Sequence, residues 1–126
     1  MEKSFSERVA EAKAAVAAIS PRAARERKES QPNTLFLDPR DAASIASSTG
    51  IIPGALNFPL SKLSDVTDAD LPAELTSRSR PIITACQAGP VGALAAHSLK
   101  NRGFTNVCFI ESGTQGWLNA GYSTNK

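Results

Sequence analysis

The stretch from Ile82 to Ala96 constrains the fold more than any other part of the chain. It opens with the β-branched residues Ile82, Ile83 and Thr84, which favour a strand, and passes through Cys86 and a turn of small residues into an Ala- and Leu-rich helix. A strand that runs directly into a helix is the building unit of α/β folds. A cysteine at such a junction lies at a helix N-terminus, where unpaired N–H groups and peptide dipoles favour the ionised thiolate. Cys86 is therefore the candidate nucleophile of this chain.

Strand-like and helix-like segments alternate along the remaining sequence, which predicts an α/β sheet with parallel pairing. Apolar residues at helical spacing predict an amphipathic helix over 5–18, and Ser20-Pro21 supplies an N-cap and a first helical proline for a second helix to about Glu29. Further strands are expected at 34–37, 56–58 and 107–110, with helices after Asp41, near 72–77, from the Cys86 turn to Arg102, and around Trp117.

Composition narrows the class of protein. The 126 residues suit one domain, and the net charge of +2 comes from dispersed Lys and Arg with only 6% aromatic residues, so we expect no nucleic-acid partner. No apolar run reaches the ~20 residues that cross a bilayer. The apolar stretch 14–19 follows Glu2, Glu7 and Glu11, which is unlike the basic start of a signal peptide. A soluble, cytoplasmic protein without membrane contact is therefore expected.

The two cysteines are expected to have different roles. Cys108 lies within the apolar run 107–110, which predicts a buried strand and a structural thiol. If the strands are parallel, the turns at 38–41, 86–92 and 111–114 gather at one edge of the sheet, where open α/β sheets bind ligands. This arrangement places Cys86 at the functional edge.

Four motifs, in order and at matching spacing, resemble those of the rhodanese family. They are the strand end Leu35–Arg40, the turn Gly50–Asn57, the cysteine loop Cys86–Gly89, and the closing segment Glu111–Trp117 with Ala120–Tyr122. The resemblance covers about Ser20 to Tyr122. It implies an open, mainly parallel five-stranded sheet flanked by helices over residues 20–126, with residues 1–19 as an extra N-terminal amphipathic helix.

The resemblance also implies a sulfurtransferase in which Cys86 takes up a sulfane sulfur as a persulfide and passes it to a thiol, a protein cysteine or another nucleophile. The partners would be a small sulfur donor and that acceptor, with no metal or other cofactor. The residues suit this chemistry, because one thiolate does the covalent work and backbone N–H groups can hold the charge. The loop residues expected to form this substrate-binding cradle are Gln87, Ala88, Gly89, Val91 and Gly92.

Asp38 and Arg40 follow the strand that precedes this edge. An Asp at a strand end can accept N–H bonds from a neighbouring turn, and an Arg can hold a carboxylate through two parallel hydrogen bonds. We therefore expect both residues to organise the edge of the sheet around Cys86. The other interpretation is that Asp38 only caps the helix that follows.

The cysteine loop departs from the family pattern in its charge. Many active rhodaneses carry arginine directly after the cysteine and again near the end of the loop, where this chain has Gln87 and Val91. Pro90 also removes one backbone N–H. The uncharged loop predicts that thiosulfate is a poor sulfur donor.

Two other classes of function are considered for a chain with this cysteine loop. One is a catalytically weak rhodanese-like module for binding, regulation or redox sensing. The other, a phosphatase or arsenate reductase on a related cysteine loop, needs an arginine six residues beyond the cysteine, and this chain has Gly92 there. That absence excludes the second class. The sequence indicates no particular donor, acceptor or oligomeric state.

Overall fold

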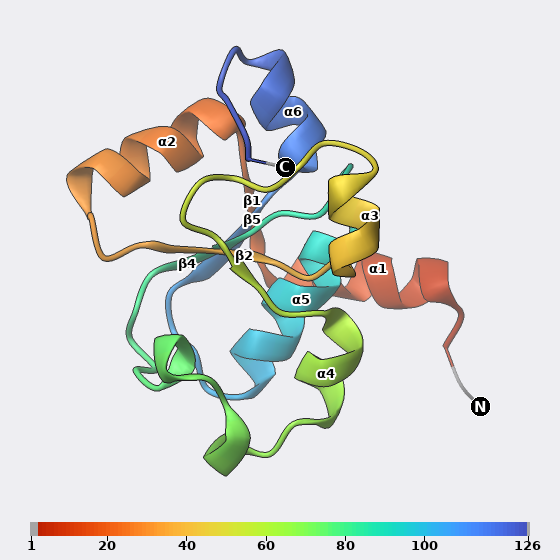
Figure 1. The fold of residues 1–126 in the computed structure, drawn as a ribbon. Helices are drawn as coiled ribbons and strands as arrows, with labels where there is room; N and C mark the ends of the chain where they lie inside the picture. Colours follow the sequence, from red (N-terminus) through yellow and green to blue (C-terminus); the bar gives the residue numbers. More distant parts are fainter. Residues whose placement is uncertain (1–2, 126) are drawn as a thin grey trace.

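The computed structural model describes residues 3–125 and contains one five-stranded sheet in the order β1-β5-β4-β2-β3, in which every pair of neighbours is parallel (Figure 1). The strands are β1 (Ala17–Ile19), β2 (Leu35–Asp38), β3 (Leu56–Asn57), β4 (Ile82–Thr84) and β5 (Val107–Ile110). The predicted α/β class and parallel five-stranded sheet are confirmed.

The helices occupy the segments between the strands. They are α1 (Phe5–Ala15), α2 (Pro21–Ser30), α3 (Ala42–Ala46), α4 (Leu60–Asp65), α5 (Pro90–Asn101) and α6 (Gly113–Asn119), with 3-10 turns η1 (Asp68–Asp70) and η2 (Ala73–Leu75). The predicted start of α2 is confirmed, because the Ser20 hydroxyl accepts the Ala23 N–H at 3.1 Å ahead of Pro21.

The N-terminal helix is shorter than the sequence predicts. The apolar spacing extended it to Ala18, whereas α1 ends at Ala15 and the next residues form β1. Ala17 and Ala18 have high helix propensity, but pairing with Cys108 and Phe109 of β5 satisfies their backbone groups in the sheet instead. The prediction was wrong here because a tertiary contact outweighed local propensity.

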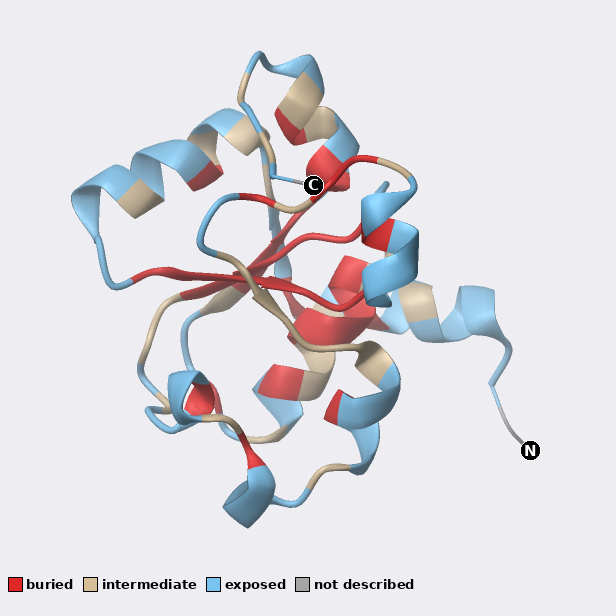
Figure 2. Cartoon of the chain, viewed as in Figure 1, coloured by how far each residue is buried: buried red, intermediate tan, exposed pale blue. Residues whose placement is uncertain are grey.

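Helices cover both faces of the sheet. On one face, strand residues including Phe36, Ile83 and Cys108 pack against Ala24 of α2 and Trp117 of α6. On the other face, alternate residues such as Leu37 and Ile82 pack beneath α5 and α4. Figure 2 shows that burial is concentrated in the strands and on the inward side of α5. The central strands β2, β4 and β5 are buried on both faces, as parallel strands usually are, whereas the edge strands β1 and β3 are partly exposed.

The N-terminal helix lies against α5. Ala12 is fully buried in a cluster with Ala93, Ala96 and Phe109, and the Lys100 ammonium donates to the Ala15 carbonyl at 2.6 Å. Thus α1 and β1 extend one side of the molecule through a packed interface and a sheet pairing. Within residues 3–125, no helix has the length and apolar content needed to span a bilayer.

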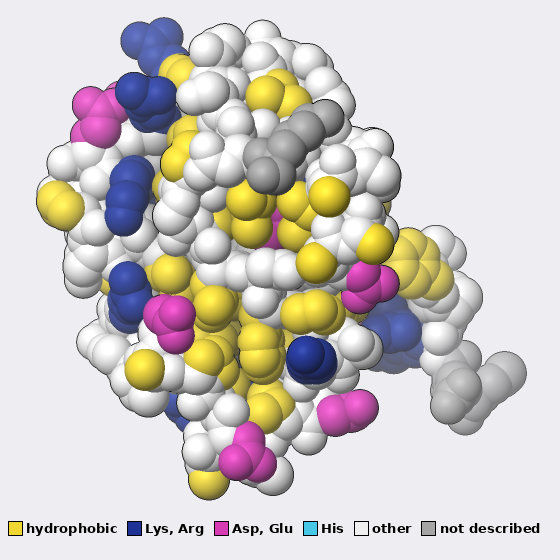
Figure 3. Space-filling view, viewed as in Figure 1, with side chains coloured by type: hydrophobic (Ala, Val, Ile, Leu, Met, Phe, Trp, Pro, Cys, Tyr) yellow, Lys and Arg dark blue, Asp and Glu magenta, His cyan; other side chains and the backbone are white. Residues whose placement is uncertain are grey.

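The opposite edge of the sheet is less completely covered. β3 is the edge strand there, and Phe58 and Val66 beside it are half-buried. Figure 3 shows hydrophobic side chains reaching the surface near α4 on this face. A shallow hollow of about 510 Å³ lies among them, lined by Phe58, Ser61, Lys62, Asp65, Val66 and Asp70.

Candidate functional site

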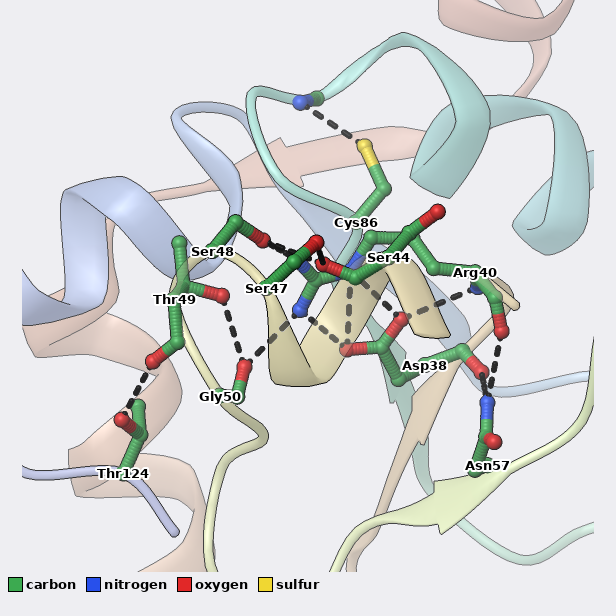
Figure 4. Close-up of polar contacts among 11 residues, drawn as sticks. Asp38, Arg40, Ser44, Ser47, Ser48, Thr49, Gly50, Asn57, Cys86 and Thr124 are labelled. Carbon is green, nitrogen blue, oxygen red and sulfur yellow. Dashed lines mark hydrogen bonds and ion pairs between the residues drawn. The ribbon is translucent and has the colours of Figure 1, made fainter. Parts of the chain in front are cut away.

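Three turns that follow β2, β4 and β5 meet at the carboxyl edge of the sheet, as the sequence predicts. The turn after β2 contains Asp38 and Arg40, and the turn after β4 contains Cys86 (Figure 4). The turn after β5 reaches the cysteine loop directly, because the Thr114 N–H donates to the Cys86 carbonyl at 2.7 Å. Ala85 is tied to β2 by its N–H bond to the Leu37 carbonyl at 3.0 Å.

Cys86 is held between the end of β4 and the start of α5. Its Sγ accepts the Gly89 N–H at 3.0 Å, and the residue is 3% exposed. The loop closes this tightly because Gly89 adopts a φ of +123°, a conformation that residues with a Cβ rarely reach, and Pro90 then begins the helix. A backbone N–H directed at the sulfur stabilises negative charge there.

The remaining loop residues surround Cys86 in different ways. Gln87 and Ala88 are exposed, Val91 is half-buried and Gly92 is buried. A Cβ atom at Gly92 would lie 3.2 Å from the Cys86 nitrogen, so this glycine allows α5 to pack closely under the cysteine backbone. Of the predicted loop residues, Gly89 alone has a hydrogen bond to the sulfur within residues 3–125.

Asp38 and Arg40 form a buried ion pair, with 2% and 8% exposure. Arg40 Nη2 donates to Asp38 Oδ2 at 2.7 Å and Nε donates to Oδ1 at 3.0 Å, which is the predicted two-bonded arrangement. The Arg40 backbone N–H also donates to Oδ1 at 3.0 Å. The carboxylate is therefore engaged by Arg40, and α3 starts beyond it, after Asp41.

Arg40 also links β2 to the turn that precedes β3. Its guanidinium donates to the Gly50 carbonyl at 3.0 Å and to the Ser48 hydroxyl at 3.2 Å. Asn57 reinforces the same strand end, since its side-chain amide donates to the carbonyls of Asp38 and Arg40 at 3.1 and 2.7 Å (Figure 4). The ion pair fixes the backbone at the carboxyl end of β2.

Cys108 is a buried free thiol on the sheet face covered by α2. Burial raises its pKa, an effect that the nearby positive charge of Arg27, with Nη1 at 3.4 Å from Sγ, partly offsets. The thiol is therefore kept in its neutral form, as a structural cysteine is.

The sheet register separates the two cysteines. Cys108 pairs with Ile83, and Cys86 lies three residues further along the chain. Three residues of extended strand span roughly 10 Å, whereas disulfide-linked Cα atoms are at most about 7 Å apart. A disulfide between Cys86 and Cys108 requires the backbone to move.

Sequence reasoning did not identify several residues at this edge. Asn57, Thr114 and Gln115 lie within motifs quoted above from the sequence, but their bonding partners come from other turns, and so does the Arg40 that bonds Ser48. No local pattern therefore indicated these particular bonds. Gly113 could have been identified from the sequence, because a glycine at the start of a short helix indicates either a positive φ or the close approach of another segment. The structure shows both, with a φ of +65° and contact with the cysteine loop.

The fold is a parallel α/β domain with a cysteine loop at the carboxyl edge of its sheet. The model of the rhodanese-like domain family matches residues 20–120, so this chain belongs to that family. Membership of the family supports a sulfurtransferase-type function.

Solved structures show the same fold. A protein of unknown function from Rhodopseudomonas palustris, named as a possible tyrosine phosphatase, has a TM-score of 0.84 at 23% identity, covering 99% of this chain and 96% of that one. The polysulfide-sulfur transferase homodimer of Wolinella succinogenes has a TM-score of 0.75 at 22% identity, covering 96% and 86%. The human single-domain sulfurtransferase has a TM-score of 0.67 at 24% identity, covering 82% and 96%.

Proposed function

We propose that the protein is a sulfurtransferase that carries a sulfane sulfur as a persulfide on Cys86. The single observation that supports this most is the Gly89 N–H, 3.0 Å from the Cys86 sulfur at the start of α5. An N–H in this position stabilises an anionic sulfur without a side-chain acid or base. We also propose that the Asp38–Arg40 pair organises the carboxyl edge of the sheet. The two hydrogen bonds within the pair support this role, because they hold the end of β2 rigid.

The reaction has two displacement steps. The Cys86 thiolate attacks the terminal sulfur of a donor R–S–SH, the donor S–S bond breaks, and R–S⁻ leaves with the electron pair, so that Cys86 bears –S–SH. An acceptor thiolate then attacks the terminal sulfur of this persulfide and Cys86 leaves as a thiolate. One sulfur atom moves without net oxidation of the protein, and no cofactor takes part.

The proposed donor is a thiol-borne persulfide or a polysulfide, with thiosulfate as a poor one. Gln87 is exposed beside Cys86 and Val91 is half-buried, and neither supplies a cation for the oxyanion oxygens of thiosulfate. The acceptor is a small thiol or a protein cysteine. We place this activity in the cytoplasm, because both cysteines are free thiols and that compartment keeps thiols reduced.

A second candidate is a rhodanese-like module for binding, regulation or redox sensing. The observation that favours it is the 3% exposure of Cys86, since a reactive cysteine is usually more accessible than this. A phosphatase gains no support from the loop, because Gly92 occupies the position where the oxyanion clamp requires an arginine.

The test is the mass of the intact protein after exposure to glutathione persulfide, polysulfide or thiosulfate, followed by release of the sulfur to a thiol. We expect the addition of one sulfur atom, located on Cys86 by peptide mapping and lost to the acceptor. Cys86→Ser should take up none, whereas Cys108→Ser should take up sulfur normally because its side chain lies in the core. Absence of sulfur uptake from all three donors would favour the binding module.

A further inference from the structure

The turn between β5 and α6, residues 111–115, is bonded to the cysteine loop through backbone groups. The Thr114 N–H donates to the Cys86 carbonyl at 2.7 Å, and the Gln115 N–H donates to the Gln87 carbonyl at 3.0 Å. These N–H groups belong to the first turn of a helix, where they have no acceptor within the helix itself. The two carbonyls of the cysteine loop therefore take the place of an N-terminal cap for α6.

Two glycines allow the segments to approach this closely. A Cβ atom at Gly113 would lie 2.6 Å from the carbonyl group of Gln87 and 2.7 Å from the carbonyl oxygen of Cys86. In the other direction, a Cβ atom at Gly89 would collide with the carbonyl oxygen of Glu111. Each segment thus has a glycine where the other segment's backbone passes, and both glycines have positive φ.

This contact lies next to the peptide that carries the Gly89 N–H. Cys86, Gln87 and Gly89 belong to one short turn, and the carbonyls of the first two are held from outside by α6. Those bonds fix the 86–87 and 87–88 peptide planes, and the next plane along the loop carries the Gly89 N–H that bonds the Cys86 sulfur. In this arrangement the whole residue Cys86 is 3% exposed.

We propose that the β5–α6 turn is the positioning element of Cys86, with Gly113 and the backbone N–H groups of Thr114 and Gln115 holding the cysteine loop so that the Gly89 N–H bonds the sulfur. The importance of this element for sulfur transfer rests on the proposed function, whereas its effect on the thiol itself does not. Loosening the contact frees the cysteine loop, and the Gly89 N–H then no longer stays on the sulfur.

The test uses two substitutions at the exposed residue Gln115. Gln115→Pro deletes the N–H that bonds Gln87, at a first-turn position where a helix tolerates proline. Gln115→Ala is its matched control, because it removes the same side chain and keeps the N–H. Two rates are measured in each protein: alkylation of Cys86 by iodoacetamide, followed by peptide mass, and sulfur uptake from glutathione persulfide.

We expect Gln115→Pro to be alkylated about fivefold more slowly than Gln115→Ala, because the loss of one hydrogen bond to the sulfur leaves less thiolate to react. Sulfur uptake should fall by about the same factor. The direction of the change is decisive, because a turn that only limited access to the thiol would make both reactions faster when loosened. A rise in both rates, or equal alkylation rates in the two variants, would overturn the proposal.

A second pair of variants covers the case in which proline disturbs α6 itself. Gly113→Ala should change both rates as Gln115→Pro does. Its control is Gly121→Ala, since Gly121 also has a positive φ, of +94°, but no described atom lies within 4 Å of its Cβ position. If Gly121→Ala changes the two rates as much as Gly113→Ala does, strain alone accounts for the effect and the positioning role is wrong.

The two proposals fail in different ways. If the unmodified protein takes up no sulfur, the proposed function fails, and the alkylation rates still decide whether this turn holds the thiol. If sulfur uptake is present and alkylation does not respond to either pair, the positioning element is wrong and the sulfurtransferase stands.

Discussion

The two thiols of this chain show how position within one sheet separates reactivity from packing. Cys86 lies beyond the end of its strand with an N–H on its sulfur, whereas Cys108 lies within a strand and under α2. A cysteine side chain is suited to chemistry at position 86 and to packing at position 108. The reason is that the Cys86 sulfur has a backbone N–H directed at it, one that the sheet leaves unpaired.

The raised pKa of Cys108 predicts a loss of stability in alkaline solution. The unfolded thiol ionises at its ordinary pKa of about 8.5, whereas burial keeps the folded thiol protonated to higher pH. Stability from this group is therefore intact below the ordinary pKa and is lost as the pH rises from there through the raised pKa of the folded state. Urea unfolding from pH 7 to 10 should show a steeper decline in the free energy of unfolding for the unmodified protein than for Cys108→Ala. Parallel curves would contradict this origin.

The uncharged loop predicts donor preference. We expect glutathione persulfide to react at least about tenfold faster than thiosulfate, equivalent to 1.4 kcal/mol in activation free energy. In the double variant Gln87→Arg, Val91→Arg, the two cations should raise thiosulfate turnover because guanidinium groups bind oxyanions through paired N–H bonds. Thiosulfate:cyanide transfer is the measurement.

The double variant Gln87→Met, Val91→Met is the matched control, since methionine is long and flexible but uncharged. It should leave thiosulfate turnover at the level of the unmodified protein. Efficient use of thiosulfate by the unmodified protein, with no increase in the arginine variant, would show that backbone amides alone bind this donor.

At the level of elements, the ends of helices and strands were more predictable where a local hydrogen bond defines them. Ser20 and Pro21 define the start of α2 as the sequence predicts, and α5 ends at Asn101, close to the predicted end at Arg102. In contrast, β1 was assigned to the preceding helix, and α4 was not predicted. Both depend on partners far along the chain: β1 on β5, and α4 on the core that buries Leu63.

In the candidate site, too, features defined by neighbouring residues were predictable and features defined by distant partners were not. The cysteine, its glycine turn and the Asp38–Arg40 pair stand in local patterns and were predicted. The bonds from Thr114 and Gln115 to the cysteine loop join segments that only the folded sheet brings together, so no periodicity or spacing reports them.

The buried Asp38–Arg40 pair predicts strongly coupled effects on stability. Asp38→Ala or Arg40→Ala leaves one charge buried without its partner, and each should lower the free energy of unfolding by about 3–5 kcal/mol. The double variant should lose clearly less than the sum of the two, because no isolated charge remains. Urea unfolding of the four proteins provides the cycle, and additive losses would show that the two side chains act independently.

Substitution of the Asp38–Arg40 pair should affect the rate of sulfur uptake less than it affects stability. Asp38→Ala should retain sulfur uptake at a reduced rate, since the residue holds the strand end beside Cys86 and does not bond the sulfur. A variant with lower stability but an unchanged uptake rate would limit the pair to a structural role.

At the level of the whole molecule, the division into a helix of residues 1–19 and a domain of residues 20–126 remains a prediction. The packing of Ala12 against α5 and the pairing of β1 with β5 are contacts that a chain beginning at Ser20 would lose. We expect such a chain to unfold at a lower temperature and to self-associate, because the edge of β5 and the apolar surface of α5 become exposed. Calorimetry and light scattering measure both effects, and an equally stable monomer would establish residues 20–126 as independent.

The pairing of Ala17 with Cys108 has a consequence for how the protein is made. During synthesis β1 leaves the ribosome before the other four strands of the described sheet, yet its neighbour β5 is the last of the five to emerge. Until then the nascent chain carries an unpaired strand and a cysteine loop that α6 has not yet bonded. Cys86 therefore acquires its folded surroundings only after β5 and α6 have been made, and the newly made thiol is open to solution before that point.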